Sequence, residues 1–483
     1  MSRILIRAGK EPWVPITPET TLAGNVLGTN SGNAVFSTAV FSALAADGVT
    51  LEADYFQVER IRSAPHIAGL LDDRYDRFVL PFANAFRPPF LPYLARWTKV
   101  IRSLTKPVTI AGIGGQFEAG TSDAISPKVA DATDEFMRAV LDRAPSVGVR
   151  GERTAEFLKA LGYGDEHVRV IGCPSMYRAD RAVSVRKRTP TLEPGARVAL
   201  SATPRMKERG DAVPNMARII AEATEMYPDS FYVPQDNQDL AMLLWGAAPG
   251  GPRYDGFPVT AEHPLISLNR TRFYVDPRPW FDDLSGVDFL VGSRIHGAIA
   301  ALVAGTPACV LAFDSRTQEL SEYHAIPHRL LPELSRNISI ADLYDEFDEG
   351  RFMRVQAENR VRYIDFLDEH GITHILDDDV ATDAYRAKMS TARLAEPVDA
   401  RFVLDTSPTE RERLAWLRSG LGDSAAQQEL QSKIPSWVAT AKSPAPAARR
   451  PSAPATPAAG APAKRQNRSF ARRLRSAARA LLG

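Results

Sequence analysis

The sequence predicts an α/β protein made of two Rossmann-like domains and a basic C-terminal tail. The chain has 483 residues, which is longer than a domain with a single hydrophobic core usually is. Apolar strand-like runs alternate with helical patterns, which is typical of parallel sheets covered by helices. One basic, proline-bearing stretch, VRKRTPTLEPG, interrupts this alternation. We therefore expect domains at 1–188 and 189–375, a helical extension at 376–441, and a linker with a tail helix at 442–483.

The first predicted domain contains four strand-like runs and two clear helical patterns. Val35, Phe36 and Val40 share one face of a helix that stops at Gly48, and glycine is a common helix terminator. Each strand-like run ends near a glycine or a polar residue, where a loop or helix can begin. The strands are expected at 77–86, 106–115, 146–150 and 168–172, and the helices at 33–48 and 152–162.

The second predicted domain repeats the alternation after the basic stretch. Its runs include VDFLVGS and PACVLAF, which are short, apolar and suited to buried parallel strands. The strands are expected at 197–204, 230–235, 271–276, 287–293 and 307–313, and the helices at 214–227, 279–286, 294–305 and 316–324.

The tail differs in composition from the rest of the chain. Residues 442–483 hold ten Lys or Arg and no acid, so the net charge of +1 conceals an acidic body. Its Pro/Ala-rich part lacks large apolar side chains and is expected to be a disordered linker. In the last segment, Phe470, Leu474 and Leu481 recur at helical spacing opposite several arginines, which suits an anionic membrane surface. The alternative is a solvated helix or a nucleic-acid patch, although we do not expect nucleic acid as a partner.

Cysteine usage and the N-terminus indicate a cytoplasmic protein. Cys173 and Cys309 are too few for a disulfide framework and lack zinc-site spacing, so we expect buried thiols and no metal. The apolar run Ile4 to Ile6 is too short for a signal peptide, and no unbroken apolar run of about 20 residues predicts a membrane span. Any membrane contact is expected to be peripheral, on the inner face, through the tail.

Arg294 and His296 stand at the entrance of the predicted helix 294–305, in the segment GSRIHGAIAALVAGTP. They follow a predicted strand, and ligands of open α/β sheets bind beyond the carboxyl ends of strands. A helix N-terminus there favours an anion. Arg294 can grip phosphate or carboxylate, and His296 can exchange a proton near neutral pH. The segment predicts an anionic substrate whose reaction needs an acid. The structural alternative is a capping histidine and an Arg294 ion pair with an acid such as Asp288.

A second candidate for ligand contact is the glycine-rich segment GIGGQ at 112–116. Gly114 and Gly115 would let the backbone approach a phosphate, with Gln116 beside them. We expect these three residues to contact substrate.

Three segments occur in the same order as in a known family. They are KPVTIAGIGGQ, GVRGERTAEFLKALGYGDEHVRVIGCPSMY and SRIHGAIAALVAGTPACVLAFDSRTQELSEYHAIP. The first is similar to the Gly-rich strand end of the polysaccharide pyruvyltransferase family. The second resembles its Arg-ended strand followed by a Gly-Cys-Pro-Ser/Thr turn, and the third resembles its C-terminal signature. The resemblance spans about residues 20 to 340 and leaves out the tail.

The resemblance implies a GT-B-like fold and transfer of pyruvate from phosphoenolpyruvate (PEP) to sugar hydroxyls as a ketal. It implies that His296 is the general acid and that Arg294 contacts the donor. It further implies a donor contact from Arg150, across an interdomain cleft, and a substrate contact from Ser175. PEP is then a co-substrate and no cofactor is expected. The acceptor is expected to be a precursor of a cell-surface or exported polysaccharide, as a glycan or lipid-linked oligosaccharide. For Arg150, the alternative is a surface ion pair with Glu152.

One position departs from the family pattern. The family reads Asn-x-Gly-Asp at the start of the first helix, whereas this sequence reads NSGN and places Asn33 where the acid would be. Asn33 is expected to keep a helix-capping oxygen and to lie at the substrate, without the charge.

Two other functions compete with pyruvyl transfer. A GT-B glycosyltransferase could hold the diphosphate of a nucleotide sugar at the same helix N-terminus. A catalytically degenerate relative could keep the fold and serve as a membrane-anchored scaffold, although a decayed site would be expected to lose the costly charges at 150, 294 and 296.

Overall fold

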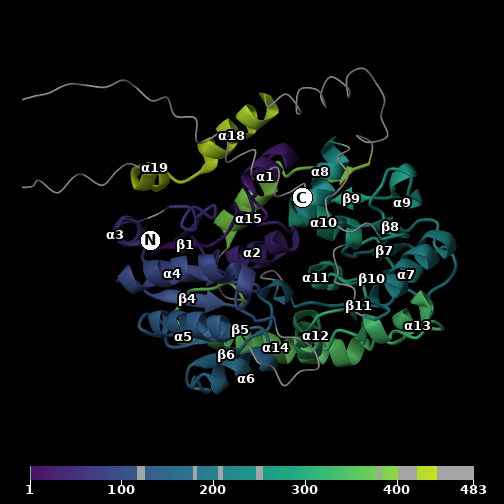
Figure 1. Cartoon of the computed structure of the whole chain (residues 1–483), viewed down its shortest axis with the longest axis horizontal. Helices are drawn as coiled ribbons and strands as arrows, with labels where there is room; N and C mark the ends of the chain where they lie inside the picture. Colours follow the sequence, from purple (N-terminus) through teal and green to yellow (C-terminus); the bar gives the residue numbers. More distant parts are fainter. Residues whose placement is uncertain are drawn as a thin grey trace, which may run out of the picture.

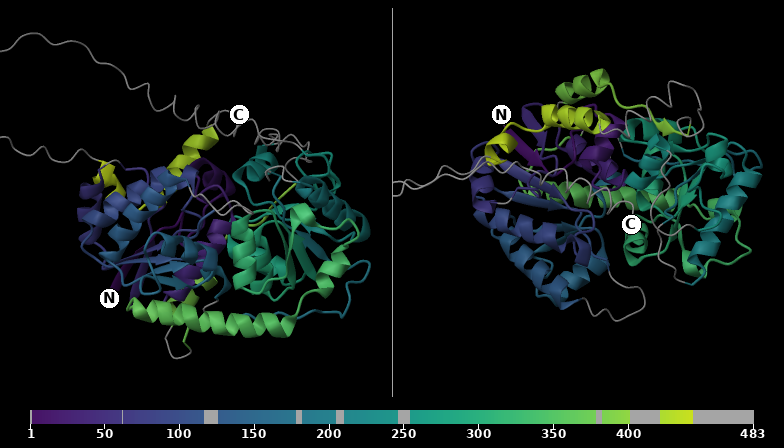
Figure 2. Two further views of the ribbon diagram at one scale, coloured as in Figure 1. Left: turned by 60° about the horizontal axis from the view of Figure 1, so that its bottom comes forward. Right: turned by 45° about the horizontal axis from the view of Figure 1, so that its top comes forward.

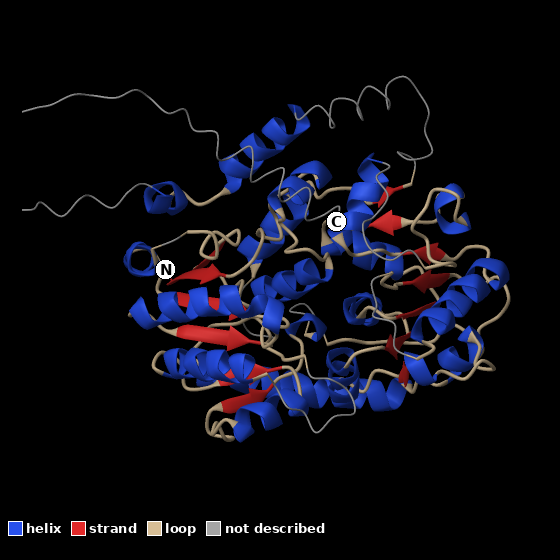
Figure 3. Cartoon of the chain, viewed as in Figure 1, coloured by secondary structure: helices blue, strands red, loops and turns tan. Residues whose placement is uncertain are grey.

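The computed structural model contains two separate parallel β-sheets with helices packed around them (Figures 1 and 3). It describes residues 2–61, 63–116, 126–177, 182–204, 210–245, 254–377, 382–400 and 421–442. The two sheets lie in different halves of the molecule, and a GT-B-like pair of Rossmann-like domains is the result. The predicted fold class is thereby confirmed. The predicted disordered linker and tail helix lie outside the described residues.

The first sheet has the strand order β2-β1-β3-β4, and all of its pairings are parallel. A parallel β5-β6 pair continues it through one bridge between Ile113 and Val149. Strands β3 and β4 are buried almost throughout, as expected where helices cover both faces of a sheet. The strands are β1 (Ser2–Ile6), β2 (Val49–Ala53), β3 (Arg77–Pro81), β4 (Val108–Ala111), β5 (Val147–Val149) and β6 (Val168–Val170).

The second sheet has the order β12-β11-β10-β7-β8 and is also parallel. One predicted strand, 271–276, joins this sheet only through a single parallel bridge between Thr271 and Tyr232 of β8. The strand that forms there, β9 (Arg272–Phe273), pairs antiparallel with β13 (Val398–Asp399). The strands of the sheet are β7 (Val198–Leu200), β8 (Phe231–Tyr232), β10 (Phe289–Gly292), β11 (Ala308–Ala312) and β12 (His328–Leu330).

Most of the helices connect successive strands and cover the sheets. Those of the first half are α1 (Pro18–Gly24), α2 (Gly32–Ala43), α3 (Ala64–Asp72), α4 (Leu91–Ser103), α5 (Pro127–Leu141) and α6 (Glu152–Ala160). Those that follow are α7 (Ala212–Met226), α8 (Asn237–Trp245), α9 (Pro264–Ser267), α10 (Pro277–Leu284), α11 (Ile295–Ala304), α12 (Ser315–Tyr323), α13 (Ile340–Asp345), α14 (Glu349–Glu369), α15 (Asp383–Thr391), α18 (Leu421–Lys433) and α19 (Trp437–Lys442). Short 3-10 turns occur at Pro88–Phe90, Pro174–Met176 and Leu331–Glu333.

Helix α14 joins the two halves, as the long green helix in the left view of Figure 2 shows. Near its start, Gln356 bonds His324 of the second half, with Nδ1 and Oε1 3.1 Å apart. At its end, the Glu369 carboxylate accepts hydrogen bonds from Ser146 Oγ at 3.1 Å and Arg169 Nη2 at 2.8 Å, both of the first half. One helix therefore contacts both halves. The predicted domain boundaries at 188/189 and 375/376 stay predictions.

Helices α18 and α19 return to the first half. The Glu429 carboxylate accepts hydrogen bonds from Thr17 N at 3.2 Å and Thr17 Oγ1 at 2.8 Å, beside α1. Trp437 is fully buried in the core that contains α3. Among the described helices, none is both long enough and apolar enough to cross a membrane.

Candidate functional site

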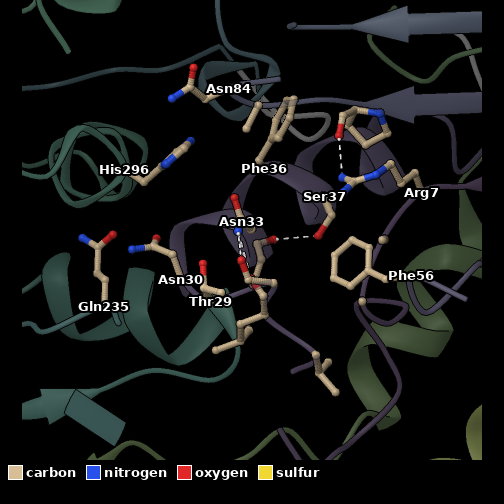
Figure 4. Close-up of a pocket in the computed structure, with 18 of the residues that line it drawn as sticks. Arg7, Thr29, Asn30, Asn33, Phe36, Ser37, Phe56, Asn84, Gln235 and His296 are labelled. Carbon is tan, nitrogen blue, oxygen red and sulfur yellow. Dashed lines mark hydrogen bonds between the residues drawn. The ribbon is translucent and has the colours of Figure 1, made fainter. Parts of the chain in front are cut away.

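A cavity of about 270 Å³ lies between the two halves, and Figure 4 shows the residues along part of its wall. The segments that line it follow the carboxyl ends of parallel strands. Arg7 follows β1, Arg150 follows β5 and Arg294 follows β10. Asp236 comes from the loop after β8. This is where open α/β sheets place their ligands, and here both sheets contribute to one cavity.

His296 lies in the first turn of α11 and faces the cavity while remaining 8% exposed. Its ring is stacked on Phe36, with the centroids 6.5 Å apart and the planes 26° apart. Nε2 lies 3.7 Å from the Cys173 Sγ. Gly32 gives the ring room, because a Cβ at Gly32 would come within 2.7 Å of the His296 Cβ. Residues of the first half therefore hold an imidazole that belongs to the second half.

Arg294 is the N-cap residue of α11, and its backbone N donates to Ser201 O at 3.1 Å. Its Nη2 donates to Thr203 Oγ1 at 3.0 Å and to the Asp236 carboxylate. The partner is therefore not Asp288, whose carboxylate accepts instead from the Arg197 backbone N at 2.7 Å. The Arg294 Nε is buried and has no hydrogen-bond partner among the described residues.

Arg150 is 1% exposed, so the alternative of a surface ion pair with Glu152 is wrong. Its Nε donates to Gly112 O at 2.9 Å, and its guanidinium carbon lies 5.4 Å from the centre of the Phe36 ring. Its Nη2 is buried without a partner in the described part of the chain. Arg150 and His296 thus pack against the same phenylalanine, which brings together two predicted site residues that are far apart in the sequence.

Arg316, which sequence analysis did not single out, also lines the cavity. It lies in the first turn of α12, just after β11, and its Nη2 pairs with the Asp314 carboxylate at 3.2 Å. Its Nε is buried and unpartnered within the described ranges. Its position could have identified it as a candidate, because it lies four residues beyond the end of a strand and inside a segment quoted for the family resemblance. Arg7, Arg87 and Asn84 line the cavity as well and were not anticipated.

The electrostatic field of the site is strongly positive. Burial lowers the pKa of His296 well below its ordinary value, and Arg150, Arg316 and Arg294 lower it further. The imidazole is therefore neutral at pH 7 in the ligand-free protein. Three guanidinium groups with unused buried N–H donors, gathered around one histidine, form a site that an anion would complete.

Four of the predicted contact residues are not among the residues that line the cavity. Gly114 packs behind Arg150, where a Cβ would lie 2.9 Å from the Arg150 Cδ. Gly115 N donates to Thr154 Oγ1 at 3.3 Å, and Gln116 Oε1 accepts from Asn84 Nδ2 at 3.2 Å. Ser175 Oγ lies 3.2 Å from the Cys173 Sγ, one residue removed from His296. These four residues therefore contact the residues that line the cavity, or neighbours of those residues, without lining it themselves.

Asn33 lines the cavity, but the prediction that its oxygen caps the helix is wrong. Its Nδ2 donates to Leu27 O at 2.9 Å and to Gly28 O at 3.3 Å, as Figure 4 shows. The N-cap residue is Ser31, whose side chain makes no capping bond, and Asn30 Oδ1 accepts from Gly32 N at 2.8 Å. Asn33 is already the second residue of α2, so its side chain can reach back only to the carbonyls of the preceding loop. An aspartate, which lacks the N–H groups, could not make these two bonds.

Within the described ranges, no group of three or more His, Cys, Asp or Glu side chains could hold a metal ion. The lining residues are rich in nitrogen donors, and Asp236 is the carboxylate among them. Such a donor set suits an anion rather than a cation.

The model of the polysaccharide pyruvyl transferase family matches residues 30–315, which include Asn33, Arg150, Arg294 and His296. No curated protein sequence matches. Similar solved structures include S. aureus MnaA with UDP (10% identity, 82% of this chain and 100% of that chain, TM-score 0.37). They also include UDP-GlcNAc 2-epimerase from Neisseria meningitidis bound to UDP-GlcNAc (10%, 80% and 99%, 0.35) and the glycosyltransferase SnogD from Streptomyces nogalater (13%, 76% and 96%, 0.30). Because the family model covers more than half of the chain, the protein belongs to the polysaccharide pyruvyl transferase family.

Proposed function

We propose that this protein transfers the pyruvyl group of PEP to two hydroxyls of a glycan acceptor and forms a pyruvate ketal. The observation that carries the proposal is the arrangement of Arg150, Arg294 and Arg316 around His296 in one cavity. PEP bears a phosphate and a carboxylate, and both are anions that guanidinium groups bind with charge-assisted hydrogen bonds. The three arginines come from both halves, so one small donor would be held across the cleft.

The reaction requires a proton, and His296 is placed to supply it. As an imidazolium, His296 gives its proton to C3 of the PEP double bond, and C2 becomes an oxocarbenium-like electrophile. One sugar hydroxyl adds to C2 and passes its proton to the imidazole, which has just lost one. A second hydroxyl of the same sugar then displaces phosphate from C2, its proton leaves with the phosphate, and the ring of the ketal closes. General acid catalysis of such a step contributes about 10² to 10⁴ in rate.

The remaining predicted residues take supporting roles in this proposal. Gly114 and Gly115 shape the turn behind Arg150, and Gln116 orients Asn84 at the cavity wall. Ser175 acts on His296 through Cys173, which lies between them. Asn33 holds the loop before α2, next to the place where the acceptor would enter. No cofactor is required, because PEP serves as co-substrate.

The acceptor is proposed to be a precursor of a surface or exported polysaccharide, made on the cytoplasmic side of the membrane. A lipid-linked oligosaccharide would suit the basic tail, which we propose contacts anionic lipid peripherally. Sedimentation with vesicles tests this proposal by comparing the full-length chain with one that ends at Ala441, with and without anionic lipid. Equal partitioning of the two chains would refute the proposed role of the tail.

Calorimetric titration of the purified protein with PEP tests the donor. UDP-sugars serve as comparison ligands, and Arg294→Ala is expected to abolish PEP binding. Arg188→Ala is a matched control, because Arg188 is an exposed arginine that faces Asp288 away from the cavity. Binding of PEP that Arg294→Ala removes and Arg188→Ala preserves supports the proposal. Binding of a UDP-sugar without PEP would point to a glycosyltransferase, and binding of neither would favour a scaffold that has lost catalysis.

A further inference from the structure

Helix α6 begins directly after Arg150, and its N-terminus is capped by a residue from the other half of the molecule. The N-cap residue is Gly151, which has no side chain for the purpose. Instead, the Glu319 carboxylate of α12 accepts a hydrogen bond from Thr154 N at 2.8 Å and one from Thr154 Oγ1 at 3.2 Å. A carboxylate at a helix N-terminus is also favoured by the helix dipole. The cap therefore joins α6 of the first half to α12 of the second (Figure 1).

The fit between the two helices depends on the glycine. A Cβ at position 151 would overlap the Cγ of Glu319, which is itself only 3% exposed. Gly151 has φ −176°, an extended conformation that any residue can adopt. Space for Glu319, rather than backbone freedom, is therefore what the glycine supplies.

Thr154 extends the connection to the turn behind Arg150. Its Oγ1 accepts from Gly115 N at 3.3 Å while donating to Glu319. Gly114, the next residue along, packs against the Arg150 side chain. A short hydrogen-bonded path thus runs from Glu319 to the backbone that shapes the pocket of Arg150.

In the second half of the molecule, Glu319 belongs to the same helix as Arg316, α12. The two residues are three positions apart, so they lie on one face of α12. Fixing Glu319 against α6 therefore also fixes where Arg316 stands relative to Arg150. This relation spans the two halves and does not involve Arg294 or His296, which belong to α11.

We propose that Glu319 is a positioning residue of the anion site: by capping α6 across the domain boundary, it holds Arg150 and Arg316 at a separation that lets both bind one ligand. The identity of that ligand as PEP rests on the proposed function, whereas the positioning itself does not. Glu319 does not line the cavity, so it acts through the two arginines.

Three variants separate positioning from a general loss of charge. Glu319→Ala removes both bonds to Thr154, and Glu319→Gln keeps an oxygen that can accept from Thr154 N. Glu322→Ala is the matched control, because Glu322 lies one turn further on α12 and pairs with Arg153 of α6 at 3.6 Å, but is 43% exposed. All three variants lose one negative charge between the same two helices.

Two measurements are made on the full-length protein. Amide hydrogen exchange without ligand reports the protection of Thr154 and Gly115, and calorimetry gives the Kd for PEP and for inorganic phosphate. We expect Glu319→Ala to speed exchange at Thr154 and Gly115 and to weaken binding of PEP by about tenfold or more, the scale of one charge-assisted hydrogen bond. Glu319→Gln is expected to restore most of the affinity, and Glu322→Ala to match the wild type.

The outcomes distinguish this proposal from the proposed function. If Glu319→Ala folds and binds PEP as the wild type does, or if Glu322→Ala weakens binding equally, the positioning role is refuted and the donor assignment stands. If the wild type binds phosphate but not PEP, the donor assignment fails, and the phosphate Kd of the variants decides the positioning role. If Glu319→Ala does not fold, Gly151→Ala replaces it, because the added Cβ would overlap the Glu319 Cγ and displace the carboxylate from the start of α6. Unchanged affinity in Gly151→Ala then refutes the proposal.

Discussion

Binding of the donor is expected to bring a proton onto His296. In the ligand-free protein, burial and the charges of Arg150, Arg316 and Arg294 hold the pKa of His296 well below its ordinary value. A neutral imidazole cannot act as a general acid. An anion bound to the same arginines would offset the charges that disfavour the imidazolium, and the pKa would rise. The acid would therefore be formed only when the donor is present.

The size of the effect follows from Coulomb's law for an anion in contact with the site. One negative charge about 4 Å from the imidazole contributes about 4 kcal/mol at an effective dielectric constant of about 20. One pKa unit corresponds to about 1.4 kcal/mol, so a single charge raises the pKa by about three units. PEP carries more than one negative charge, so we expect His296 to take up protons when PEP binds. Because the pKa is higher in the complex, affinity falls as pH rises from the free-state pKa to the bound-state pKa, by up to about tenfold per pH unit.

Titration calorimetry in buffers of different ionisation enthalpy measures the number of protons taken up. The phosphate of PEP also exchanges protons, with a second pKa of about 6 for such groups. His296→Gln therefore provides the baseline, and the difference between wild type and variant isolates the imidazole. Identical proton uptake by the two proteins would refute the reasoning, and with it the role of His296 as an acid charged by donor binding.

Three further predictions concern catalysis and stability. His296→Ala should lower phosphate release from PEP in the presence of a glycan acceptor by about 10² to 10⁴, a larger factor than the one by which it weakens PEP binding, and equal losses in both would count against an acid. Asn33→Asp should lower the free energy of unfolding in urea by about 1–3 kcal/mol, because the Leu27 and Gly28 carbonyls lose their donor, and unchanged stability would contradict that account. Burial, and to a smaller extent the charges of Arg77 and Arg169, lower the pKa of His370 to about 4. In the unfolded chain this histidine has the ordinary pKa of about 6.5, so the unfolded state binds a proton first as pH falls. The free energy of unfolding should therefore fall by about 3 kcal/mol between pH 6.5 and pH 4. Urea unfolding of His370→Gln should show a smaller fall over the same range, and an equal fall in both proteins would refute this role of His370.

The strand-to-helix turn at residues 293–296 could be predicted because its signals are local. An apolar strand, an arginine, a histidine and a small-residue helix follow one another directly in the sequence, and the structure has β10 and α11 at these positions. The convergence of Arg150 with this turn was inferred from family resemblance. Local patterns cannot bring together residues that are more than a hundred positions apart.

The elements that sequence analysis did not anticipate have weak local patterns. β1 has only the three apolar residues Ile4 to Ile6, yet it lies in the interior of the first sheet because β2 and β3 pair with it on either side. The predicted strand 77–86 was too long, since only Arg77–Pro81 form β3. Ala83 beyond it lines the cavity, whereas Phe82, Ala85 and Phe86 pack into the core of the first half, so tertiary packing rather than a strand ladder buries them.

The arginines of the cavity differ in how many of their hydrogen-bond donors are already used within the protein. Arg7 lines the cavity, but its Nε and Nη2 both lie 2.6 Å from the Glu59 carboxylate, and its guanidinium packs over the rings of Phe56 and Phe82. These contacts use the guanidinium donors of Arg7 within the protein and hold this part of the cavity wall in place. Arg150 instead has a buried Nη2 without a partner among the described residues, although an unsatisfied buried donor costs about 1–3 kcal/mol. A residue with a purely structural role would gain by bonding that donor, so the cavity divides into a wall around Arg7 whose donors are used within the protein and an end around His296 whose unused donors suit an anion.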